Sequence, residues 1–156
     1  MKVPFFDYSK LAKFDYPKYK EKLDEVLLRS DFIMRDDHFA FELKIAKYMD
    51  SKYFLGVANG TDAIWISLIA AGVSAGDEVI LPSHTYVATA DSVKLLGATP
   101  VLVDCDHNHL IDPEAIEDAI TEKTSAIIPV NLNGTAADLE KIVSLAAKHN
   151  LKVIED

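Results

Sequence analysis

The chain has 156 residues, of which 49% are hydrophobic and 26% charged, a composition typical of one globular domain with a core of its own. A net charge of −9 argues against a nucleic-acid surface, because contacts with phosphate need clustered Lys and Arg. There is no run of about 18 apolar residues, no signal-peptide pattern at the start, and only one cysteine, Cys105. We therefore expect a cytoplasmic protein without a membrane span, a disulfide or a cysteine-based metal site.

The first 50 residues are predicted to form an arm followed by two helices. Residues 1–16 show no periodicity and are expected to be irregular. Apolar residues at helical spacing predict a helix over residues 17–29, with a proline in its first turn. A second helix is predicted over residues 36–49, where two aspartates suit its N-terminus. The remainder, residues 51–156, is expected to form one larger domain.

Short apolar segments that alternate with helical patterns begin at residue 53. The predicted strands are residues 53–58, 78–81, 99–104, 125–130 and 152–155. The predicted helices are residues 61–71, 86–96, 113–121 and 136–149. Strands that alternate with helices are joined by right-handed crossovers and lie parallel, with helices on both faces. The pattern predicts an α/β fold of three layers, αβα, around a mostly parallel sheet.

The first of these strands is predicted to run into a buried helix through Asn59-Gly60-Thr61. A helix that starts there presents free backbone N–H groups and a positive dipole end, which bind anions and phosphate above all. Gly60 lets the backbone approach a ligand, and the Thr61 hydroxyl can add a hydrogen bond. Asp62, in the first helical turn, is expected to point away from such an anion. The same pattern is also ordinary turn chemistry, so this junction alone leaves both interpretations open.

In a parallel sheet, ligands bind beyond the carboxyl ends of the strands. The residues expected there are Asn59 to Thr61, Ser83 to Tyr86, Asp104 to His107, Asn131 to Gly134, and Asp156. Structural interpretations stay open for several of them. Tyr86 could be a core residue, Asp156 a helix cap and Asn131 a turn residue. No metal site is expected, because the acidic residues around Cys105 lack the spacing of a ligand set.

Six segments, taken in order, resemble the DegT/DnrJ/StrS family of sugar-nucleotide aminotransferases, which use pyridoxal phosphate (PLP). They are Val3 to Asp7, Asn59 to Ala63, Gly76 to Thr89, Gly97 to Asp104, Pro129 to Gly134, and Val153 to Asp156. The resemblance covers nearly the whole chain. It implies the large domain of the PLP-dependent transferases of fold type I, of which this chain would hold the N-terminal part.

The resemblance also implies a role for five residues. Gly60 and Thr61 would hold the cofactor phosphate at the helix N-terminus. Tyr86 would stack on the pyridine ring, and Asp156 would pair with the pyridinium nitrogen. Asn131 would reach the phenolic oxygen of the cofactor. The family usually has His at the position of Asn131 and Tyr at that of Asn133, so this loop is expected to recognise its ligand differently.

The activity that the resemblance implies is transfer of an amino group from glutamate to a nucleotide-linked keto-sugar, by a homodimer when complete. The lysine that forms the Schiff base lies downstream of residue 156 in the family, so the catalytic residue is not assigned and the 156-residue chain alone is expected to be inactive. A PLP-dependent sugar dehydratase, in which His replaces that lysine, stays open as an alternative. A Rossmann-type module that binds nucleotide is less favoured, because its first turn would be Ala58-Asn59-Gly60-Thr61-Asp62 instead of Gly-x-Gly-x-x-Gly. A non-catalytic protein that only binds a partner is a third alternative.

The resemblance also implies which strands of the sheet pair with one another. In the family, the first strand pairs only with the seventh, while the second to fifth strands lie together. Residues 53–58 are therefore expected to lack their neighbour, and residues 152–155 to form an uncovered edge.

Overall fold

The computed structural model describes Val3 and residues 7–156, apart from the side chain of Leu11. The chain divides into two compact units, Met1–Gly56 and Val57–Asp156. None of the described helices combines the length and the apolar character that crossing a bilayer requires.

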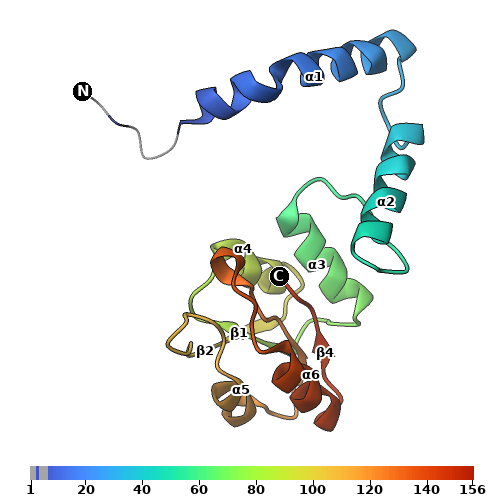
Figure 1. The fold of residues 1–156 in the computed structure, drawn as a ribbon. Helices are drawn as coiled ribbons and strands as arrows, with labels where there is room; N and C mark the ends of the chain where they lie inside the picture. The colour runs from blue at the N-terminus through green and yellow to red at the C-terminus, as the bar shows by residue number, and fades with distance from the viewer. Residues whose placement is uncertain (1–2, 4–6) are drawn as a thin grey trace. The chain divides into compact units, whose positions relative to one another are not determined.

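The first unit contains helices α1 (Tyr8–Arg29) and α2 (Asp36–Tyr48) (Figure 1). The prediction that residues 1–16 are irregular is wrong from Tyr8 onward, whereas residues 1–2 and 4–6 lie outside the described part. The reason is a local cap, since Asp7 Oδ1 accepts a 3.1 Å hydrogen bond from the backbone N–H of Ser9 and so starts the helix ahead of Pro17. Pro17 consequently lies inside α1.

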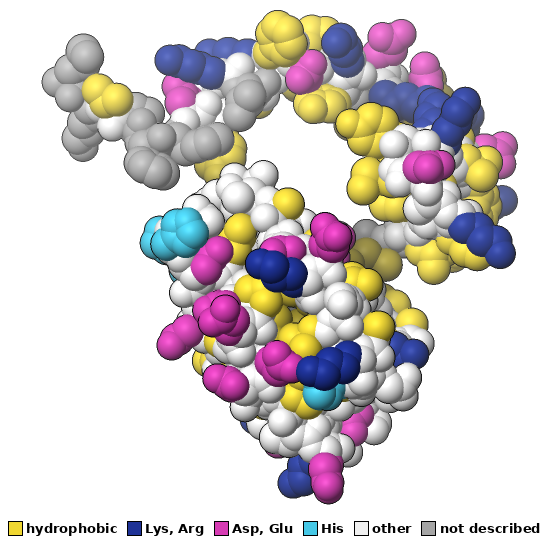
Figure 2. All heavy atoms as spheres, turned by 60° about the horizontal axis from the view of Figure 1, so that its bottom comes forward, with side chains coloured by type: hydrophobic (Ala, Val, Ile, Leu, Met, Phe, Trp, Pro, Cys, Tyr) yellow, Lys and Arg dark blue, Asp and Glu magenta, His cyan; other side chains and the backbone are white. Residues whose placement is uncertain are grey.

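Hydrophobic side chains of the first unit are largely exposed, as the yellow atoms over α1 and α2 in Figure 2 show. α2 contains no buried residue. The two helices are joined by ion pairs of Asp37 with Arg29 and with Lys22. The hydrogen bond from Arg29 to the Asp37 carboxylate, followed by the one from Lys22, holds the pKa of Asp37 below its usual value.

The second unit is built on a four-stranded parallel sheet with the order β2-β1-β3-β4. The strands are β1 (Glu78–Pro82), β2 (Thr99–Val103), β3 (Thr124–Ile127) and β4 (Lys152–Val153). These are the second to fifth strands predicted from the sequence, and they lie together as expected. Within the described residues β4 pairs only with β3, so it forms one edge of the sheet.

The prediction of a strand over residues 53–58 is wrong, because these residues join no sheet. A strand needs a neighbour to pair its backbone groups, and no strand of the described part lies beside this segment. The N–H of Gly56 donates instead a 2.8 Å hydrogen bond to Glu42 Oε1 on α2.

Helices cover both faces of the sheet, as Figure 1 shows for α3 and α4 on one side and α5 and α6 on the other. They are α3 (Gly60–Ala70), α4 (Val87–Leu95), α5 (Pro113–Ala119) and α6 (Leu139–Lys148), with a short 3-10 helix η1 (Leu132–Gly134) before α6. Leu68 and Val93 pack with Leu81 in one fully buried cluster, whereas Ile80 packs with Ile142 in the other. Neighbouring residues of β1 thus face opposite layers. The predicted three-layer α/β fold is confirmed.

Candidate functional site

A cavity of about 230 Å³ opens at the carboxyl edge of the sheet, where α3 and α4 begin and where the last residue of the chain lies. It is lined by Gly60, Thr61, Ile64, Tyr86, Ala88, Thr89 and Asp156. The structure therefore brings together four of the five residues predicted from the sequence, although they come from three separate segments. Asn131 is not among the lining residues.

The first turn of α3 forms one wall of this cavity. Asn59 caps the helix, its Oδ1 accepting a 2.9 Å hydrogen bond from the N–H of Asp62. No hydrogen bond of the described residues uses the backbone N–H of Gly60 or Thr61. A Cβ added to Gly60 would meet nothing within 4 Å, so the space beside Gly60 is open. Two free donors at the positive end of a helix that lines a cavity suit an anionic group.

Asp62 lies in the same turn, but its carboxylate is held by hydrogen bonds outside the cavity wall. Its Oδ1 accepts a 2.9 Å hydrogen bond from the indole N–H of Trp65, and its Oδ2 accepts one of 3.1 Å from the Asn59 amide. Asp62 is absent from the cavity wall. The network of Asn59, Asp62 and Trp65 thus fixes the start of α3 from the side away from the cavity.

Asp156 forms the opposite wall and is held by both its backbone and its side chain. Its N–H donates to Pro129 O at 2.9 Å, and its carbonyl accepts from the N–H of Asn131 at 2.8 Å, so the pairing of β3 with β4 continues past the ends of both strands. Its Oδ2 accepts a 2.7 Å hydrogen bond from the hydroxyl of Thr89, which is 1% exposed. This bond restrains the side chain of Asp156, which lines the cavity and is exposed.

Tyr86 is the N-cap residue of α4 and makes no side-chain cap bond. It is 75% exposed, which overturns the alternative in which it is a core residue. An aromatic ring that lines a cavity without being packed into the core can offer its face to a planar ligand.

Asn131 is occupied by its own neighbours. Its Oδ1 accepts a 2.9 Å hydrogen bond from the N–H of Ala137, and its Nδ2 donates one of 2.5 Å to Glu155 Oε1. The predicted contact of Asn131 with the cofactor stays a prediction.

Sequence reasoning assigned no role to Thr89, which the structure places in the wall. Its position in the Gly76 to Thr89 segment was the only signal available, because its partner Asp156 lies 67 residues further along the chain.

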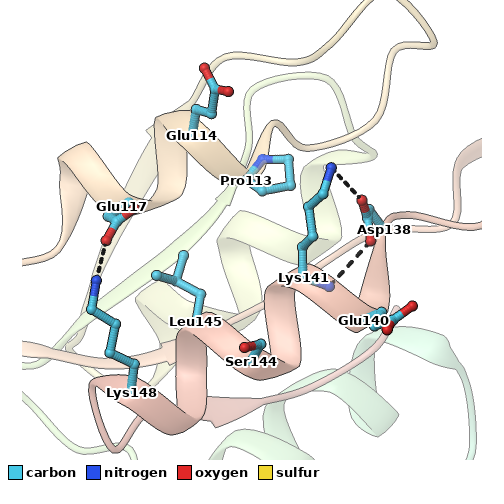
Figure 3. Close-up of a pocket in the computed structure, with 9 residues that line it drawn as sticks. All are labelled: Pro113, Glu114, Glu117, Asp138, Glu140, Lys141, Ser144, Leu145 and Lys148. Atoms are coloured by element: carbon cyan, nitrogen blue, oxygen red, sulfur yellow. Dashed lines mark hydrogen bonds and ion pairs between the residues drawn. The ribbon is translucent and has the colours of Figure 1, made fainter.

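A second hollow, of about 670 Å³, lies between α5 and α6 (Figure 3). Figure 3 shows Lys148 directed at Glu117 and Lys141 at Asp138, and the two ion pairs measure 2.5 and 3.0 Å. Its charged groups pair largely with one another. In the described part of the chain, no group of three or more His, Cys, Asp or Glu residues could hold a metal ion.

A parallel sheet covered on both faces, with a cavity at its carboxyl edge, matches the fold of solved aminotransferase structures. The chain belongs to the DegT/DnrJ/EryC1/StrS aminotransferase family, whose model matches residues 16–156. The family predicted from the sequence is thereby confirmed.

Three comparisons illustrate the relationship. The chain is 48% identical over 157 aligned residues to a "pleiotropic regulatory protein" of Geobacillus stearothermophilus, covering 100% of this chain and 42% of that protein. It is 45% identical to the UDP-2-acetamido-2-deoxy-3-oxo-D-glucuronate aminotransferase of Pseudomonas aeruginosa, covering 89% of this chain and 40% of that one. The crystal structure of NtdA from Bacillus subtilis with bound cofactor PMP matches with a TM-score of 0.96 and 37% identity, covering 99% and 36% of the two chains. The chain thus spans about two fifths of the length of its relatives.

Proposed function

We propose that this chain forms the cofactor-binding part of a PLP-dependent aminotransferase that moves an amino group from glutamate to a nucleotide-linked keto-sugar. The observation that carries the proposal is the cavity itself, which sets the free N–H groups of Gly60 and Thr61, the ring of Tyr86 and the carboxylate of Asp156 around one space. Family membership supports the activity, and the name of the Pseudomonas relative supports a nucleotide-linked keto-sugar as substrate.

The residues present fit PLP by their chemistry. The start of α3 supplies backbone donors, the Thr61 hydroxyl and a positive dipole end for the phosphate. Tyr86 supplies an exposed aromatic face for the ring. Asp156 supplies an anionic partner for a protonated ring nitrogen. When bound, the cofactor acts as the electron sink for amino transfer, and the protein controls its orientation and charge.

The assembly and location of the protein belong to the same proposal. We propose a homodimer, as the family resemblance implies, and a cytoplasmic location, as expected from the single cysteine. The many exposed hydrophobic side chains of α1 and α2 support burial of this unit in a larger assembly. The 156 residues alone are expected to be inactive, because they do not include the lysine that the resemblance assigns to covalent cofactor binding.

The proposal is tested with the complete protein that contains this chain. The protein is incubated with PLP, glutamate and a panel of UDP- and dTDP-linked keto-sugars, and 2-oxoglutarate formation is followed. We expect 2-oxoglutarate to form only when cofactor and one of the sugars are both present. A complete protein that fails to bind PLP would refute the proposal. Loss of a hydroxyl group from the sugar without addition of an amino group would identify the dehydratase instead.

A further inference from the structure

Two threonine hydroxyl groups form a series of hydrogen bonds that ends at the carboxylate of Asp156. The Thr89 hydroxyl donates to Asp156 Oδ2 at 2.7 Å and lies 3.0 Å from the hydroxyl oxygen of Thr85. A hydroxyl has one hydrogen, and an ionised carboxylate has none to give, so the Thr89 hydrogen goes to Asp156. Thr85 must then be the donor to Thr89. The three side chains form one series, in which Thr89 is a better donor to Asp156 because it accepts a hydrogen bond from Thr85.

Thr89 does not make the bond that a helical threonine usually makes. A Thr inside a helix commonly donates to a backbone carbonyl three or four residues earlier. Thr89 lies in the first turn of α4, yet its hydroxyl donates to a carboxylate beyond β4. Because Thr89 is 1% exposed, its hydroxyl is shielded from competing water, and the bond to a charged acceptor is of the stronger kind.

This bond leaves one oxygen of the carboxylate for a ligand. Asp156 is exposed, and its side chain would otherwise be free to rotate about its terminal torsion. The hydrogen bond from Thr89 to Oδ2 restricts this rotation. Oδ1 enters no hydrogen bond with the described residues, so it is the oxygen of this cavity-lining carboxylate that is left for a ligand.

The same helical turn also carries Tyr86. The backbone N–H of Thr89 donates to the carbonyl of Tyr86 at 3.1 Å. Thr89 is therefore bonded through its backbone to the residue that offers the ring, and through its hydroxyl to the residue that offers the carboxylate.

We propose that Thr89, supported by Thr85, is a positioning residue that orients the Asp156 carboxylate so that Oδ1 meets the pyridine nitrogen of PLP and keeps that nitrogen protonated. This inference rests on the proposed function. Thr89 itself touches the reaction only through Asp156, and its loss lowers the protonated fraction of the nitrogen without removing the carboxylate.

The test uses the complete protein loaded with PLP labelled with ¹⁵N in the ring, and measures the nitrogen resonance at neutral pH together with the Kd for PLP. Thr89→Val removes the hydroxyl and keeps the shape, whereas Thr89→Ser keeps the hydroxyl. Asp156→Asn gives the resonance without a carboxylate. Thr124→Val is the matched control, because it makes the same change at a buried threonine at the start of β3.

We expect the nitrogen resonance of Thr89→Val to move from the wild-type position toward that of Asp156→Asn, and the Kd to rise about twofold to tenfold, the effect of one hydrogen bond. Thr89→Ser and Thr124→Val should match the wild type. If Thr89→Val does not fold, Thr89→Cys, with a thiol that donates only weakly, should show the same direction of change.

Two outcomes would overturn the role of Thr89, and only the second would also overturn the assignment of Asp156. If Asp156→Asn moves the resonance while Thr89→Val leaves it at the wild-type position, Thr89 is only structural and the proposed function stands. If Asp156→Asn leaves the resonance unchanged, Asp156 is not the partner of the nitrogen, and the site assignment under the proposed function fails with the inference.

Discussion

Asn59 Oδ1 accepts a 2.9 Å hydrogen bond from the backbone N–H of Asp62, and the Asn59 amide donates back to the Asp62 carboxylate at 3.1 Å. This reciprocal pair resembles a capping box and fixes the turn at which α3 begins. Because the free N–H groups of Gly60 and Thr61 lie between these two residues, the pair also fixes the donors that face the cavity.

Asn59→Ala should therefore loosen the start of α3. Loss of a cap costs about 0.5–2 kcal/mol of helix stability. Amide hydrogen exchange of the complete protein, measured by mass spectrometry, should become faster in the peptide that contains residues 60–65. Asn59→Ser retains a capping oxygen and should exchange at nearly the wild-type rate. Equal exchange in the Ala variant and the wild type would show that the cap does not hold this turn.

Thr61→Val should weaken binding of PLP to the complete protein. The side chain keeps its shape but loses a hydroxyl that lines the cavity, at a cost of about 1–3 kcal/mol for a bond to a charged group. Equilibrium dialysis should show the Kd rising by roughly five- to 150-fold. Ser67→Ala removes an exposed hydroxyl further along α3 and should leave the Kd unchanged. An unaltered Kd for Thr61→Val would remove Thr61 from the phosphate site.

Asp156→Asn should separate binding from activity. The amide has nearly the shape of the carboxylate and can still accept the hydrogen bond from Thr89, so the fold and cofactor binding should persist. Transamination should fall on the order of 10²–10³-fold, the range for losing one preorganised electrostatic partner. Steady-state assays with glutamate, alongside dialysis with PLP, make the comparison. Activity close to wild type would mean that Asp156 is only structural.

Lys148→Met should raise the pKa of Glu117 toward its usual value. In the folded chain a 2.5 Å hydrogen bond from Lys148, together with the charge of Lys148, holds the pKa of Glu117 below that value. A carboxyl group with a lowered pKa in the folded state contributes stability above its unfolded pKa. That contribution is lost as the pH falls through the lowered, folded pKa. The variant should therefore lose stability at neutral pH, where the pair is present, but not at a pH below the lowered pKa.

NMR titration of the carboxyl carbons checks the pKa directly. Lys141→Met is the matched control on the same helix, because the hydrogen bond of Lys141 lowers the pKa of Asp138 instead. It should raise the pKa of Asp138 and leave that of Glu117 where it is. The side chains of Glu117 and Asp138 are both exposed, so the change in each pKa should become smaller as salt is added.

Several features of the fold could be predicted from the sequence because their causes are local. The alternation of apolar strands with helices identified four strands of the sheet and the helices on its two faces. The junction Asn59-Gly60-Thr61 carries its own cap and its own free donors within a few residues, so the capped start of α3 was predictable as well. The cap at Asp7 is equally local, but the absence of periodicity before Pro17 concealed the start of α1.

Other features depend on partners that are distant in the chain, and only the tertiary structure decided them. An apolar run such as residues 53–58 becomes a strand only beside a neighbour, and the described part of the chain supplies none. Nothing in the local sequence distinguishes Thr89 from the other threonines. Its partner Asp156 lies 67 positions further along the chain, and only the fold brings the Thr89 hydroxyl within 2.7 Å of Asp156 Oδ2. Asn131 was predicted at a strand end, but the N–H of Ala137 and the carboxylate of Glu155 determine where its amide points. Local sequence sets which groups a turn presents, whereas long-range pairing sets which of those groups meet.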